Sequence, residues 1–260
     1  MKILAVETAT ARQSVAILEN DTIVARRDQD AEGAHGTLLL PAIDGLLAQC
    51  GWPLRHLDGL ACSIGPGSFT GIRVGMATCL GLRAATGLPL VLVPTLEAMA
   101  WSVRATSLPM CPVLTSRRGE VYWALFRWTE TGRLGRVLGE QVGAPSRLAH
   151  SLTEETLIFG SGWMAMEAEI RAALSVTVTV GPESATIPSA VQVAQIGLNR
   201  LRQGEVAGDV VTPLYVQRAE AEVQYDQSGG ISPVVRRQKR VERKVAERLA
   251  RGRRRRAERS

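Results

Sequence analysis

The residues best suited to chemistry form a glycine-rich turn between a predicted strand and a predicted helix. The turn reads Gly65-Pro-Gly-Ser-Phe-Thr-Gly71. Free backbone amides and the dipole of the following helix converge on such a turn, which is a common way to bind phosphate. The spacing of its glycines differs from that of a Walker A loop, a dinucleotide fingerprint and a nucleophile elbow. Two interpretations stay open: a tight turn in which Ser68 or Thr70 caps the helix, and an anion-binding loop.

Side chains that bind metals or act as nucleophiles are scattered along the chain. No histidine has a metal-ligand neighbour at the spacing of a helical turn, and no two cysteines form a C-x-x-C pair. Each cysteine lies in an apolar stretch, so we expect small buried hydrophobic residues in a reducing compartment and no metal site. The residues concerned are His35, His56, His150, Cys50, Cys62, Cys79 and Cys111.

Short apolar segments and amphipathic runs predict an α/β protein in which one arrangement occurs twice. In the first half, three strands precede a helix, a strand, a second helix, a strand and a third helix. In the second half, three strands again precede alternating helices and strands. The predicted elements are strands 2–7, 13–19, 22–27, 59–64 and 90–93 with helices 35–50, 71–86 and from 95, then strands 113–116, 120–128, 137–142 and 156–159 with helices 163–174 and 189–202, the last capped by Ser189.

The pattern predicts a first lobe at residues 1–108, a second lobe at 109–218, and a linker with a basic tail at 219–260. Residues 236–260 contain 13 Lys or Arg and 3 Glu, a net charge of +10. Since the whole chain carries +6, residues 1–235 carry −4. The body is therefore mildly acidic, and the positive charge is concentrated at the end of the chain.

The composition, with 45% hydrophobic and 22% charged residues, is that of a globular protein. The start, Met1 to Glu7, becomes acidic too early for a secretory signal, and no run of 18 apolar residues occurs. We therefore expect a soluble cytoplasmic protein that does not enter a membrane.

Two predicted helices of the first lobe lack a convincing polar side. Residues 37–48 contain a single charge, Asp44, and residues 71–86 contain only Arg73 and Arg83. A helix that packs on a sheet normally has a polar side that faces the solvent. The outer faces are therefore covered by each other, by the second lobe, or by another protein subunit. The stripe Gly71, Gly75 and Cys79 would admit a neighbouring helix at close range.

Several of these segments together resemble the TsaB (YeaZ) family, in order over residues 1–218. The resemblance implies an actin-like (ASKHA, RNase H-like) fold of two βββαβα lobes. It also implies a role in making threonylcarbamoyladenosine (t6A) in tRNA, next to the anticodon. The segments are 6–10, 35–47, 119–124, 160–163, 213–218 and the glycine turn extended to Gly75, whose loop residues are Gly65, Pro66, Gly67, Ser68, Phe69, Thr70 and Gly71.

The resemblance implies a non-catalytic partner that binds TsaD directly, with the ATPase TsaE joining through the complex. In TsaD a His-x-x-x-His pair holds the metal, and Thr95 and Met99 occupy those positions here. Neither side chain replaces an imidazole, so the metal site is absent. Many family members have Asp at position 7 and at position 115, whereas this chain has Glu7 and Thr115. The role of those acids in relatives is therefore in doubt here.

No cofactor is expected in this chain, although the binding of ATP or ADP at the interface with TsaD stays open. A nucleotide would lie near Glu7, Thr8, Thr10 and Arg117. The first-lobe helices would form the TsaD-binding surface, and Met76→Glu is expected to disrupt the complex. The predicted interface residues are Leu39, Ile43, Leu46, Leu47, Ile72, Arg73, Met76 and Leu80.

Two alternative functions and the role of the basic tail stay open at this point. One is an enzyme of actin-like fold that acts alone, kinase-like or peptidase-like, although no nucleophile lies in a pattern with a base. Another is a homodimer that uses the same apolar helices. The basic tail either stays solvated or contacts a polyanion, which would be tRNA, a ribosome or a membrane surface. The residues assigned to tRNA binding are Arg253, Arg254, Arg255 and Arg256.

Overall fold

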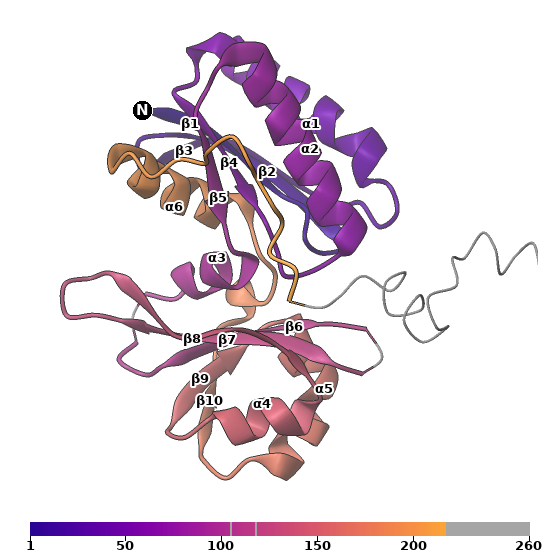
Figure 1. Cartoon of the computed structure of the whole chain (residues 1–260), viewed down its shortest axis with the longest axis vertical. Coiled ribbons are helices and arrows are strands. Elements are labelled where there is room, and N and C mark those ends of the chain that lie inside the picture. The colour runs from indigo at the N-terminus through magenta and orange to yellow at the C-terminus, as the bar shows by residue number, and fades with distance from the viewer. Residues whose placement is uncertain (105, 118, 217–260) are drawn as a thin grey trace, which may run out of the picture. The chain divides into compact units, whose positions relative to one another are not determined.

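The computed structural model describes residues 1–104, 106–117 and 119–216, which form two five-stranded sheets (Figure 1). The strand orders are β3-β2-β1-β4-β5 and β10-β9-β6-β7-β8. In each sheet three antiparallel strands come first, and two parallel strands follow on the other side of the first one. The predicted duplication of an α/β lobe is therefore confirmed. The predicted linker and tail, with Arg253–Arg256, lie outside the described residues.

The elements of the first half lie close to the predicted ones. Gly51 ends the first helix in a left-handed conformation with φ of 66°, which glycine adopts without strain. No helix in the described part of the chain is long and apolar enough to cross a membrane. The elements are β1 (Lys2–Glu7), β2 (Arg12–Glu19), β3 (Thr22–Asp30), α1 (His35–Cys50), β4 (Gly59–Ser63), α2 (Phe69–Thr86), β5 (Leu90–Val93) and α3 (Thr95–Trp101).

The second half contains one strand that the sequence pattern misses. This strand, β10, has only three residues and pairs in parallel with β9. The other bounds differ from the predicted ones by at most three residues. The elements are β6 (Met110–Thr115), β7 (Val121–Trp128), β8 (Leu134–Gly143), α4 (Pro145–Ser151), β9 (Thr156–Phe159), α5 (Ser161–Ala173), β10 (Val178–Val180) and α6 (Ala190–Arg202).

Helix α6 belongs to the first sheet, although the sequence assigns residues 109–218 to the second lobe. Ser189 caps it as predicted, because its hydroxyl accepts a hydrogen bond from the amide of Val191. Gly197 lies so close to Ile3 and Ala61 of the first sheet that a side chain would collide with both. The second lobe therefore ends before this helix, which covers the sheet face opposite α1 and α2 (Figure 1).

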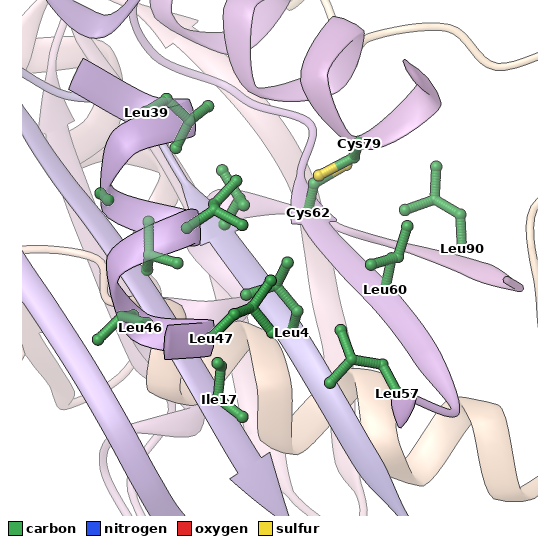
Figure 2. Close-up of a cluster of buried hydrophobic side chains, with 14 of the residues drawn as sticks. Leu4, Ile17, Leu39, Leu46, Leu47, Leu57, Leu60, Cys62, Cys79 and Leu90 are labelled. Carbon is green, nitrogen blue, oxygen red and sulfur yellow. The ribbon is translucent and has the colours of Figure 1, made fainter. Parts of the chain in front are cut away.

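The main core of the first lobe lies between its sheet and helices α1 and α2. Leu4 and Ile17 from the sheet pack with Leu39 of α1 (Figure 2). Cys62 of β4 and Cys79 of α2 point toward each other in the same cluster. Most of the large apolar side chains of both helices therefore face inward. The cysteines are free thiols, and Cys62, Cys79 and Cys111 are buried while Cys50 is half-buried.

Candidate functional site

The glycine turn is a tight connection that starts helix α2. Ser68 caps the helix, because its hydroxyl accepts a hydrogen bond of 3.2 Å from the amide of Gly71. The amide of Ser68 donates in turn to the carbonyl of Ala9, in the turn after β1. The backbone amides of Ser68 and Gly71, which a bound phosphate would need, therefore already donate hydrogen bonds within the protein. The geometry favours the capped turn over the anion-binding loop.

Glycines of the motif let the turn after β1 rest directly on α2. A Cβ atom at Gly71 would collide with the carbonyl oxygen of Thr8, and one at Gly75 with the Thr8 hydroxyl. The Thr8 hydroxyl donates to the carbonyl of Gly71 at 2.8 Å. The sequence had suggested that Gly71, Gly75 and Cys79 admit a neighbouring helix. That interpretation is wrong, because these residues face the turn after β1 and Cys62 of β4.

Glu7 is a buried carboxyl group at the end of β1. Burial raises its pKa to about 7, although the hydrogen bond from the backbone of Ala9 acts in the opposite direction. The amide of Ala9 donates to one carboxyl oxygen. Among the residues that the structure describes, the other carboxyl oxygen has no hydrogen-bond partner. The site therefore favours a neutral carboxylic acid over a carboxylate that reaches out toward a ligand.

The residues predicted near a nucleotide have different environments. Glu7 and Thr8 are fully buried, whereas Arg117 lies exposed on the turn between β6 and β7 of the other sheet. Thr10 is half-buried, and its carbonyl lies 3.0 Å from the Nε2 atom of His35. The turn after β1 is therefore fastened to α1 and α2, and its placement follows from packing within the first lobe.

Thr95 and Met99, which stand where TsaD has its histidine pair, are packed inside the protein. Thr95 is the first residue of α3, and its side chain is fully buried. Met99 is 1% exposed and belongs to a core cluster with residues of the second sheet. Within residues 1–104, 106–117 and 119–216, no group of three or more His, Cys, Asp or Glu could hold a metal ion.

Six of the eight predicted interface residues are core residues of the first lobe. They are at most 9% exposed, although Ile43 and Leu47 also line a groove at the surface of the first lobe. Small residues such as Ala48, Ala77 and Gly81 occupy much of the exposed side of α1 and α2, which explains why these helices carry few charges. Arg73 is exposed and Leu80 is half-buried. The six buried residues are Leu39, Ile43, Leu46, Leu47, Ile72 and Met76.

The surface that a partner could reach consists of the neighbouring outward positions, which we call the outer helix face. Leu40 is 54% exposed and lies on the outward side of α1. A groove of about 440 Å³ lies beside it, between α1, Trp52 and Leu82 of α2. The sequence pattern located these two helices but not the side of each that is exposed. The outer helix face comprises Leu40, Pro41, Asp44 and Ala48 of α1 with Arg73, Ala77, Gly81 and Ala84 of α2.

Comparisons with known proteins agree with this architecture. Residues 27–225 match the family model described as TsaD, tRNA N6-adenosine threonylcarbamoyltransferase. The tRNA threonylcarbamoyladenosine biosynthesis protein TsaB of Escherichia coli is 34% identical over 172 residues, which cover 64% of this chain and 73% of that protein. The TsaB protein of Bacillus subtilis is 27% identical over 231 residues, which cover 88% of this chain and 99% of that protein.

A solved structure shows the same fold. The chain is similar to YeaZ from Pseudomonas aeruginosa, with a TM-score of 0.71 and 24% sequence identity, over 83% of this chain and all of that one. The predicted actin-like arrangement of two lobes is therefore confirmed.

Proposed function

This chain belongs to the TsaB family of tRNA threonylcarbamoyladenosine biosynthesis proteins, and we propose that it serves there as the non-catalytic subunit that binds TsaD. The observation that supports this proposal best is the outer helix face, where Leu40 and a groove of about 440 Å³ lie uncovered on the first lobe. An apolar surface of this kind is typical of a protein interface. The family model matched by most of the chain is that of TsaD itself, so the proposed complex joins two related folds.

The proposal places threonylcarbamoyl transfer on TsaD. In this chain Thr95 and Met99 are buried side chains without metal-binding character, and Glu7 is buried under the turn that rests on α2. An enzyme that acts alone would need an open pocket with converging polar groups. The groove at the outer helix face is largely apolar, and Asp44 is its single charged lining residue. The groove therefore suits a partner's apolar side chains better than a substrate.

The direct test is reconstitution of the modification reaction. TsaD, tRNA and threonylcarbamoyl-AMP are combined with and without this chain, and t6A in the tRNA is measured. We expect little t6A without the chain and at least a tenfold increase with it. Turnover of ATP or a peptide by the chain alone would support the enzyme alternative instead. Size-exclusion chromatography of the isolated chain reports whether it forms a homodimer.

Ala77→Arg tests the outer helix face. Ala77 is exposed in the middle of α2, so a long charged side chain there leaves the fold intact. Buried in an interface, the same arginine would lack a partner, and we expect the affinity for TsaD to fall at least tenfold. Affinity is measured by titration calorimetry with the full chain, and t6A formation should fall in parallel.

Ala168→Arg is the matched control, because Ala168 is an exposed alanine in helix α5 of the second lobe. This variant should bind TsaD as the unmodified chain does. Equal affinity of Ala77→Arg and Ala168→Arg would contradict the proposed surface. Met76→Glu, suggested by the sequence, is unsuitable: Met76 is 4% exposed, so the charge would disrupt the first lobe itself.

We further propose that the basic residues 236–260 hold tRNA through phosphate contacts, with TsaE joining through the complex. The supporting observation is the net charge of +10 in those 25 residues, on a chain whose remainder is acidic. Contacts of this kind are not sequence-specific and weaken steeply with salt.

Deletion of residues 236–260 is expected to lower the affinity of the chain–TsaD complex for tRNA about tenfold at low salt. At high salt the difference should shrink, because screening removes the same contribution from the complete chain. Filter binding at two salt concentrations measures both values. Unchanged affinity at low salt would show that the tail is a solvated extension.

A further inference from the structure

Buried polar atoms without a hydrogen-bond partner gather at one end of the first sheet, where β1, β4 and β5 finish and β2 begins. In the part of the chain that the structure describes, seven residues carry such side-chain atoms. Two of them, Trp101 and Glu140, lie elsewhere, and the other five lie at this end: Glu7, Gln13, His35, Ser63 and Thr95. Native proteins leave few such atoms, because each one costs free energy. Their concentration marks a place where a molecule other than the protein supplies the hydrogen bonds.

Two of these side chains lie next to each other on the sheet face that α6 covers. Glu7 and Ser63 follow the paired residues Val6 and Cys62 of two neighbouring parallel strands, so they are neighbours across the sheet. Side chains alternate along a strand, and the residues two positions before each of them pack with α6. Both side chains are at most 1% exposed. One carboxyl oxygen of Glu7 and the hydroxyl of Ser63 have no partner among the described residues.

Thr95 adds a third oxygen atom on the same face. Its amide donates to the carbonyl of Gly65, just after β4, at 2.8 Å. Val93, two residues earlier, packs with α6, and Pro94 between them is extended with ψ of 135°, so Thr95 points to the same face. Its side chain is 0% exposed, and its hydroxyl has no partner in residues 1–104, 106–117 and 119–216. Three oxygen atoms therefore lie at the same end and on the same face of the sheet.

Gln13 and His35 form a second group on the opposite face. Gln13 is 0% exposed, and within the described residues neither polar atom of its amide has a partner. Val15, two residues later, packs in the core under α1, so Gln13 also faces α1. His35 is the first residue of α1, and its Nε2 atom lies 3.0 Å from the carbonyl of Thr10. A carbonyl only accepts, so Nε2 donates, and Nδ1 of the neutral ring is left as an acceptor.

We propose that this end of the first lobe encloses two sites for ordered water, one on each face of the sheet. One water joins Glu7, Ser63 and Thr95. The other accepts a hydrogen bond from the Gln13 amide and donates one to Nδ1 of His35. Buried waters typically make about three hydrogen bonds to groups of this kind. The turn after β1, on which α2 rests, lies beside both sites, so the two waters would help to hold it in place.

Water fits these groups better than a metal ion or a larger ligand. At the second site a cation offers no hydrogen to Nδ1 of His35, whereas water both donates and accepts. At the first site burial favours the neutral form of Glu7, which is a poor ligand for a cation. All five side chains are at most 6% exposed, so a larger molecule would have no way in.

Thr95→Val and Gln13→Leu test the two sites through the sign of their effect on the melting temperature of the full chain. If each side chain bonds to water, its replacement removes a hydrogen bond, and the melting temperature should fall by about 3 °C. If the sites are dry, the same changes remove an unsatisfied polar group, and the melting temperature should rise. A rise in either variant would overturn the proposal at that site.

Thr156→Val is the matched control. Thr156 is 1% exposed like Thr95, but its hydroxyl donates to the carbonyl of Glu154 at 2.8 Å. Its replacement should therefore lower the melting temperature whether or not the first sheet holds water. The size of that decrease gives the effect of one lost buried hydrogen bond, to which the decrease in Thr95→Val is compared.

A high-resolution crystal structure of the full chain identifies what fills the sites. We expect electron density for water within about 3.2 Å of the polar atoms of each group. A Ser63 hydroxyl that bonds directly to Glu7, with no density beside them, would overturn the first site. Melting temperatures in sodium, potassium and choline chloride at equal concentration should agree. A lower value in choline chloride alone would assign a cation to the first site and overturn water as its occupant.

Discussion

Gly71→Ala should lower the free energy of unfolding by about 3 kcal/mol, even though alanine is normally the best residue inside a helix. The reason is the contact between α2 and the turn after β1. A Cβ atom at position 71 would collide with the carbonyl oxygen of Thr8, which is backbone and cannot rotate away. Either α2 or the turn must shift, and the hydrogen bond from the Thr8 hydroxyl to the Gly71 carbonyl would be strained as well.

Gly81→Ala in the same helix is the matched control. A Cβ atom there meets no neighbour within 4 Å, so the substitution should raise the free energy of unfolding by up to about 1 kcal/mol. Urea denaturation followed by circular dichroism measures both variants. Equal stabilisation by the two substitutions would show that the turn after β1 yields easily, and the packing explanation for the glycine motif would fail.

The duplicated fold could be predicted because local patterns determine it. Alternating apolar residues, helix caps such as Ser189 and the stop at Gly51 act over a few residues, and each appears in the structure where the sequence places it. The three-residue strand β10 could not be found this way, since Val178–Val180 is too short to show a period. The sequence also did not predict the position of α6, because an apolar stripe on a helix does not indicate which sheet the helix covers.

The sequence did not indicate which side of α1 and α2 is exposed, and the reason is physical. Sequence patterns separate inside from outside through charge, and Ala77 and Gly81 carry none although both are exposed. A helix whose outer side is made of alanine and glycine therefore looks buried all round. The side chains that a partner could touch became visible only when the large residues, such as Ile72 and Met76, were seen to fill the core.

The path of residues 205–216 along α2 depends on contacts between distant parts of the chain. Arg73 and Tyr215 are 142 residues apart, and nothing in their local sequence indicates that they meet. Val210 lies in a stretch without a regular period, so the sequence does not indicate that its side chain is exposed. Surface features of this kind require coordinates.

Glu7→Gln is expected to raise the free energy of unfolding at pH 8 by about 3 kcal/mol and to leave it nearly unchanged at pH 4. Burial raises the pKa of the Glu7 carboxyl group to about 7 in the folded protein, from 4.5 in an exposed chain. Between these two values the folded protein holds a proton that the unfolded chain has released. The stability of the unmodified protein therefore falls as the pH rises from about 4.5 to 7, and the loss is complete by pH 8.

Glutamine has the same shape and accepts the hydrogen bond from the Ala9 amide, but it carries no charge at any pH. The variant should therefore lack this pH-dependent loss, and its stability should exceed that of the unmodified protein increasingly between pH 5 and 7. Glu169→Gln, at an exposed position on α5, measures the effect of removing a surface charge, which should stay below about 0.5 kcal/mol. Urea denaturation at pH 4, 6 and 8 provides the comparison. A Glu7→Gln protein that is less stable than the unmodified one at pH 8 would show that the ionised carboxylate is stabilised in place, and the turn after β1 would then hold a charge on which the first lobe depends.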